Sequence, residues 1–110
     1  MIDLVHDMIN ILERYGLKFV NIDTTDITLM ARIEIFPAIY IQIYRNLEKD
    51  KLNMALILGS DRVYGVDCEG GIYHEHPEED PISHVPIKER LEIEEFVVKC
   101  LNILKDRRIL

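Results

Sequence analysis

The sequence from position 38 to position 45 reads Ala38-Ile39-Tyr40-Ile41-Gln42-Ile43-Tyr44-Arg45, and it is the clearest strand of the chain. Successive side chains on a β-strand point to opposite faces. The isoleucines therefore share one face, whereas Tyr40, Gln42 and Tyr44 share the other. This alternation predicts a sheet whose two faces differ in chemistry.

Further strands are predicted on both sides of this stretch. Residues 52–58 are apolar on both faces, which is typical of a strand at the centre of a sheet. Short turns rich in glycine and aspartate separate the strands, and no long helix lies between them, which favours an antiparallel meander over parallel crossover units. The other predicted strands span residues 18–22, 27–36, 62–67 and 72–76.

An amphipathic helix is predicted at each end of the chain. Residues 2–15 repeat apolar side chains with helical period, and Gly16 is suited to end that helix. The second helix is predicted to begin near Pro86, because proline is tolerated in a first turn, and to bury Cys100 in its apolar stripe. The prediction is one α+β domain, residues 1–110, with five or six antiparallel strands and both helices packed on one sheet face.

Composition narrows the classes of function. The net charge of −7 argues against a protein that coats nucleic acid or anionic membranes through bulk charge. No segment has the roughly 18 apolar residues that span a bilayer, and the start of the chain lacks the features of a secretion signal. Cys68 and Cys100 are then expected to be reduced thiols in a cytoplasmic protein. The abundance of isoleucine, glutamate and lysine with a single glutamine is typical of thermophiles.

Three of the four histidines fall between residues 62 and 84. His74 and His76 are two positions apart on a predicted strand, so they point to the same face. Asp67 lies on the preceding strand of the same hairpin, and His84 returns after a loop. The candidate site is therefore Asp67, His74, His76 and His84, with acidic residues of the 75–80 segment nearby.

Three interpretations of this set are open. In the first, His74, His76 and His84 bind a divalent transition metal, for which imidazole and carboxylate are suitable ligands. In the second, two histidines take and give protons during RNA cleavage by the neighbouring 2′-hydroxyl, since imidazole titrates near neutrality. A cation on the phosphate would then come from Arg62 or Arg45. In the third, the polar side chains only close a hairpin.

The segment from Ala31 to His84 resembles a family of small prokaryotic proteins that includes the TumE-type toxins of toxin–antitoxin modules. The shared pattern is an isoleucine-rich strand pair, then the strand Arg62-Val63-Tyr64-Gly65-Val66-Asp67, then His74-Glu75-His76-Pro77, then His84 before a C-terminal helix. This chain departs from the family pattern at Cys68, where the family has asparagine, and its histidines are fewer and differently spaced.

The resemblance implies a toxin-like protein that cleaves RNA, with RNA and an antitoxin protein as partners. His74 and His76 would then be acid and base, Asp67 would orient one of them, and His84 would contribute to the phosphate site. The alternative is a non-enzymatic binding or interaction module that carries the metal site described above. A homodimer is also predicted, formed through a sheet edge or through the face that bears Tyr40, Gln42 and Tyr44.

Overall fold

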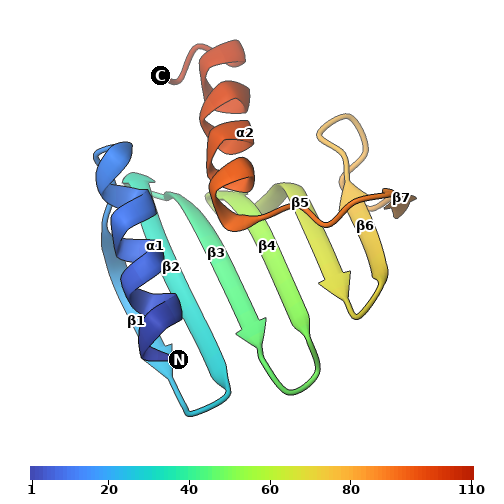
Figure 1. The fold of residues 1–110 in the computed structure, drawn as a ribbon. Helices are drawn as coiled ribbons and strands as arrows, with labels where there is room; N and C mark the ends of the chain where they lie inside the picture. The colour runs from blue at the N-terminus through green and yellow to red at the C-terminus, as the bar shows by residue number, and fades with distance from the viewer.

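The structure is a computed structural model that describes all residues from 1 to 110. Seven strands form one antiparallel sheet in the order of the sequence, with a helix before and a helix after them (Figure 1). The elements are α1 (Ile2–Arg14), β1 (Phe19–Thr24), β2 (Thr28–Phe36), β3 (Ile39–Asn46), β4 (Lys51–Leu58), β5 (Asp61–Glu69), β6 (Ile72–His76), β7 (Val85–Pro86) and α2 (Ile93–Asp106). The predicted α+β meander is confirmed, with seven strands instead of five or six.

The structure at the end of the sheet differs from the sequence prediction. Pro86 does not start the last helix; it lies in β7, paired with His74 of β6. The helix α2 begins only at Ile93, where Glu92 and Glu95 form a capping box. A strand of two residues has no detectable period, and proline is tolerated at a sheet edge, so the sequence around Pro86 suits β7 as well as a helix start.

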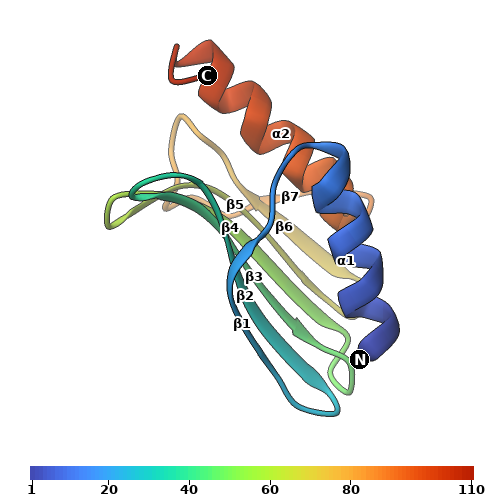
Figure 2. The ribbon, with the colours of Figure 1, turned by 90° about the vertical axis from the view of Figure 1, so that its left-hand side faces the viewer.

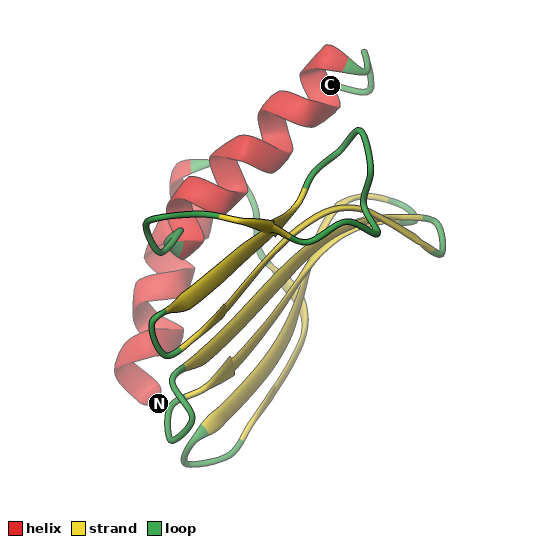
Figure 3. Ribbon diagram, turned by 90° about the vertical axis from the view of Figure 1, so that its right-hand side faces the viewer, coloured by secondary structure: helices red, strands yellow, loops and turns green.

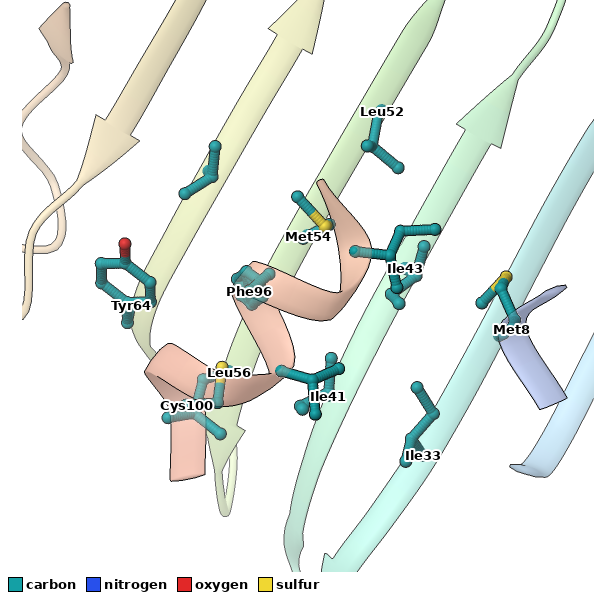
Figure 4. Close-up of a cluster of buried hydrophobic side chains, with 14 of the residues drawn as sticks. Met8, Ile33, Ile41, Ile43, Leu52, Met54, Leu56, Tyr64, Phe96 and Cys100 are labelled. Carbon is teal, nitrogen blue, oxygen red and sulfur yellow. The ribbon is translucent and has the colours of Figure 1, made fainter. Parts of the chain in front are cut away.

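Both helices lie on the same side of the sheet (Figures 2 and 3). Met8 of α1 and Phe96 of α2 are fully buried in the single core between helices and sheet (Figure 4). The ring of Phe96 stacks on that of Tyr64, with centroids 5.5 Å apart. Cys100 is also fully buried there, as predicted, and burial raises the pKa of its thiol.

The other face of the sheet has no helix on it. Two register shifts, between Glu34 and Phe36 and between Leu56 and Ile57, lie near the turns β2–β3 and β4–β5. Bulges bend a strand, and in Figure 2 these turns curve away from the helices. We call the helix-free side the open face. It is made by the residues that alternate with the buried ones, among them Met30, Arg32, Tyr40, Gln42, Tyr44, Asn53, Ala55, Asp67 and His74.

The end of α1 is tied to the start of α2 through one carboxylate. Tyr15 donates a hydrogen bond to Glu94 Oε2 at 2.7 Å, and Arg14 forms an ion pair with the other carboxylate oxygen. The hydrogen bond from Tyr15, followed by the contacts with Arg14, lowers the pKa of Glu94. Gly16 then ends α1 at φ +69°, a left-handed conformation that glycine adopts without strain, as predicted.

We expect the stability contributed by this carboxylate to disappear in acid. Because the folded-state pKa of Glu94 is lowered, its contribution is present above the unfolded-state pKa and is lost as the pH falls through the folded-state pKa. Urea unfolding midpoints of the wild type and of Glu94→Gln should therefore differ at neutral pH and converge below about pH 4. Glu13→Gln, at an exposed position of α1, is the control. A difference for Glu94→Gln that persists unchanged into acid would contradict this expectation.

Candidate functional site

The structure brings together the four residues predicted as the candidate site. The β5–β6 hairpin pairs Asp67 with His74, and β7 then runs beside β6, so His84 reaches the same place. Asp67 Oδ2 lies 2.7 Å from His76 Nε2. The ring centroid of His84 is 4.4 Å from that of His76 and 6.0 Å from that of His74. The three imidazoles and one carboxylate thus form a single group, which we call the histidine cluster.

His76 is the buried member of the cluster, with 1% of its surface exposed. Its Nδ1 lies 3.3 Å from Arg62 Nη2, while its Nε2 faces Asp67. A guanidinium can only donate, so Nδ1 must accept this hydrogen bond, and the ring proton must be on Nε2, which donates to the carboxylate. The two neighbours therefore favour one tautomer of His76, with the proton on Nε2.

This tautomer can be observed directly. In long-range ¹H–¹⁵N spectra of the folded protein at mildly alkaline pH, His76 should show a protonated Nε2 and an unprotonated Nδ1. Replacing Arg62 by alanine removes the donor to Nδ1 and should shift the population toward the other tautomer. The exposed His6 on α1, far along the chain from Arg62, should give identical spectra in both proteins. A protonated Nδ1 on His76 in the wild type would show that the arrangement is wrong.

Arg62 also holds the loop between β6 and β7. Its Nη2 donates to the carbonyl oxygen of Pro81 at 3.0 Å, and Arg107 after α2 donates to Glu78 Oε2 at 2.7 Å. The loop is therefore tied to the start of β5 and to the end of α2. It holds the chain that leads into His84 close to the buried His76. Sequence reasoning did not find this second role of Arg62, because a backbone carbonyl acceptor leaves no mark in the sequence.

The other two histidines are accessible. His84 is exposed, and His74 is partly exposed. His74 and Asp67 both line a hollow of about 330 Å³ at the end of the open face, which also includes Lys51 and Asn53. The cluster therefore combines one buried imidazole with fixed hydrogen bonds and two imidazoles that a ligand can reach.

A metal centre is not favoured by this geometry. No group of three or more His, Cys, Asp or Glu side chains is arranged to hold a metal ion. Both ring nitrogens of His76 already have hydrogen-bond partners, which leaves none to coordinate a metal. The arrangement suits proton transfer by the two accessible imidazoles better than metal coordination.

The two arginines that the sequence suggested as phosphate-binding groups differ in their surroundings. Arg45 donates to Asp50 and to two backbone carbonyls, so it closes the β3–β4 hairpin. Arg90 also binds Asp50 at 2.8 Å, and its hydrogen bond is the main cause that lowers the Asp50 pKa. Arg62 instead uses only Nη2 within the protein, and its Nε and Nη1 make no hydrogen bond. Arg62 is the arginine that remains available next to the histidines.

Two of the acidic residues near the histidines in sequence, Glu75 and Glu78, have partners outside the cluster. Glu75 points to the helix side of β6, where it accepts a hydrogen bond from Tyr64 at 2.6 Å. Burial, followed by that bond, raises the pKa of the Tyr64 hydroxyl. Glu78 is paired with Arg107. The fold therefore separates two of these carboxylates from the histidines.

Comparison with protein-family models, with curated proteins and with solved structures finds no match to this chain. None of its helices has the length and apolar character needed to cross a membrane. The function is therefore argued from the histidine cluster and its surroundings.

Proposed function

We propose that this protein is a toxin-like component of a prokaryotic toxin–antitoxin module and that it cleaves RNA by histidine acid–base chemistry. The observation that supports it is the histidine cluster, in which two accessible imidazoles lie beside the buried His76 and its partner Asp67. The resemblance of residues 31–84 to TumE-type toxins also supports this function. An antitoxin protein is the partner that this proposal includes.

The reaction is an internal transfer at phosphorus. One imidazole takes the proton from a ribose 2′-hydroxyl, and the 2′-oxygen forms a bond to the adjacent phosphorus. The bond from phosphorus to the 5′-oxygen of the next nucleotide breaks, and the second imidazole, in its protonated form, gives a proton to that oxygen. The products are a 2′,3′-cyclic phosphate and a 5′-hydroxyl end. No oxidant or cofactor is consumed, and the two imidazoles exchange protonation states.

The geometry suggests a division of roles that differs from the sequence-based one. His74 and His84 are the proposed acid and base, because a substrate can reach both. His76 is a positioning residue: its ring packs against that of His84 at 4.4 Å, and Asp67 and Arg62 hold it in place. The unused Nε and Nη1 of Arg62 are the proposed donors to the phosphate.

The test is incubation of the purified protein with an end-labelled RNA in the presence of EDTA. We expect cleavage fragments that carry 2′,3′-cyclic phosphate and 5′-hydroxyl ends. His6→Ala, which changes an exposed histidine on α1, should cleave at the wild-type rate. Expression should slow the growth of a bacterial host, and His84→Ala should relieve this effect. Intact RNA with the wild-type protein, fragments with 3′-hydroxyl ends, or loss of cleavage in EDTA would each overturn the proposal.

A further inference from the structure

Three hollows lie next to one another on the open face. The first, about 440 Å³, is lined by residues of β1, β2 and β3, and it shares Met30 and Gln42 with a second of about 540 Å³. The second shares Asn53 and Asp67 with the hollow of about 330 Å³ beside His74. We call this row of adjoining hollows the open-face trough. It crosses the sheet from β1 to the histidine cluster.

The strand register explains why the three hollows follow one another across the sheet. Two ladders of directly paired residues cross the sheet side by side, and both end at a histidine of the cluster. With about 4.8 Å between strands, the path from β1 to β6 is about 24 Å long, and the two ladders are about 7 Å apart along the strands. The first ladder is Asn21, Arg32, Gln42, Ala55, Gly65 and His76, and the second is Asp23, Met30, Tyr44, Asn53, Asp67 and His74.

The floor of the trough is low where small residues occur. Ala55 and Gly65 are neighbours in the first ladder, directly before His76. A Cβ at Gly65 would lie 3.3 Å from Arg62 Cδ and 3.2 Å from the carbonyl oxygen of Met54. The absent side chain therefore lets Arg62 lie across the floor and reach His76. This places the available guanidinium donors inside the trough, next to the cluster.

The charge of the trough differs from that of the remaining molecule. Its lining carries three cationic and three anionic side chains, whereas the whole chain has a net charge of −7. The entire excess of negative charge therefore lies outside the trough, so the lining itself adds no net repulsion of a polyanion. The charged residues of the lining are Arg32, Lys51, Arg62, Asp23, Asp67 and Glu69.

The uncharged lining suits unpaired nucleotides. Asn21, Gln42 and Asn53 carry amides, which donate and accept hydrogen bonds and can pair with base edges. The ring of Tyr44 lies in the same lining, and aromatic rings on a sheet are platforms for stacked bases. A depression two side-chain rows wide is too narrow for a base-paired helix.

We propose that the open-face trough binds single-stranded RNA across the strands and directs a phosphodiester to His74 and His84. This inference rests on the proposed function and adds the substrate class, an unpaired strand, and the path that the strand follows. The occupant is RNA because the trough combines neutral charge, amides and an accessible arginine, and because it leads directly to the cluster.

The test fills the trough without changing the histidines. Ala55→Leu adds bulk to the floor, and Asn10→Leu makes a comparable apolar addition at an exposed position of α1. Binding of a labelled single-stranded RNA is measured by fluorescence anisotropy in the His84→Ala background, which slows cleavage, and cleavage is measured with His84 intact. We expect Ala55→Leu to weaken binding at least tenfold and to slow cleavage, with an unchanged urea midpoint, whereas Asn10→Leu changes neither binding nor cleavage.

Two further measurements keep the inference falsifiable if Ala55→Leu fails to fold. Arg32→Gln, at an exposed position, should weaken binding and reduce its salt dependence. In the wild type, the slope of the logarithm of the binding constant against the logarithm of the salt concentration should not exceed about 2 in magnitude, because three cationic groups contribute roughly 0.7 each. A fully paired duplex of the same sequence should bind at least tenfold more weakly than the single strand. Equal binding of single strand and duplex would overturn the inference.

The experiments distinguish a failure of RNA binding in the trough from a failure of the proposed RNA cleavage. Cleavage that Ala55→Leu and Arg32→Gln leave unchanged overturns the trough and leaves the proposed function in place. Binding of RNA that these variants weaken, without any cleavage by the wild type, supports the trough and overturns the proposed function. A wild-type dimer that Ala55→Leu converts to a monomer on size-exclusion chromatography would show that a second copy occupies the trough, which also overturns the inference.

Discussion

Replacing His84 by alanine should lower the rate of RNA cleavage by about 10²- to 10⁴-fold, the usual contribution of a general acid or base. His84 is the exposed imidazole of the histidine cluster, and it reaches this position only through β7. Replacing His74 should have an effect of the same size, because one of the two takes the proton and the other gives it. The loss should be in kcat, with KM nearly unchanged, since neither ring is the main phosphate-binding group.

The matched control for this prediction is His6→Ala, which removes an exposed imidazole from α1 and should leave kcat at the wild-type value. Asp67→Asn is a second comparison. It removes the charge beside His76 but keeps an oxygen that accepts a hydrogen bond from Nε2–H. The rate should therefore fall by less than in His84→Ala. The measurement is the initial rate on a labelled RNA, together with the urea midpoint of each variant. Wild-type kcat in both His84→Ala and His74→Ala would contradict the assignment.

Replacing Phe96 by alanine should cost about 3–5 kcal/mol of the free energy of unfolding, the range for removing a buried aromatic ring. Phe96 is fully buried, and its ring stacks on Tyr64 between α2 and the sheet. Domains of this kind are stable by only about 5–15 kcal/mol, so this change removes a large part of the total. The loss includes the cavity that remains, because helix and sheet relax only partly around it.

The control is Phe36→Ala, which removes the same ring from a position 39% exposed at the end of β2. Its cost should be well below that of Phe96→Ala, since most of the transfer and cavity terms are absent. Urea unfolding followed by circular dichroism gives both values, with the slope m unchanged if only stability is affected. Equal costs for the two variants would show that Phe96 does not anchor α2 to the core.

Much of the fold could be predicted because local periodicity reports burial. The isoleucines at 41 and 43 are fully buried, and Tyr40, Gln42 and Tyr44 between them lie on the open face, as the alternation predicts. The helix α1 ends at Arg14, and Gly16 just after it takes the left-handed conformation, as predicted. In both cases neighbouring residues carry the whole signal, so no knowledge of distant contacts is required.

The errors occurred where distant contacts decide the structure. The start of α2 was predicted near Pro86, but those residues pair with β6 instead. Asp50 in the β3–β4 turn likewise binds Arg90, which lies forty residues away. Nothing in the local pattern at either position indicates the partner.

The candidate site was also predictable only in part from the sequence. The spacing of His74 and His76 places both on one face, and strand pairing brings Asp67 to them. The burial of His76, the hydrogen bond from Arg62 that fixes its tautomer, and the exposure of His84 depend on the loop folding back along β6. The sequence predicted which residues gather, whereas the tertiary structure decided which of them a substrate can reach.

By itself, the sequence determined the α+β class, the antiparallel order and the two chemically different faces, because alternation and helical period are properties of neighbouring residues. The tertiary structure alone decided that the helices leave one face open and that three adjoining hollows lie across it, the last of them beside the histidine cluster. The physical reason is that bulges, strand register and loop closure set distances between residues far apart in the chain, and these distances determine burial and access.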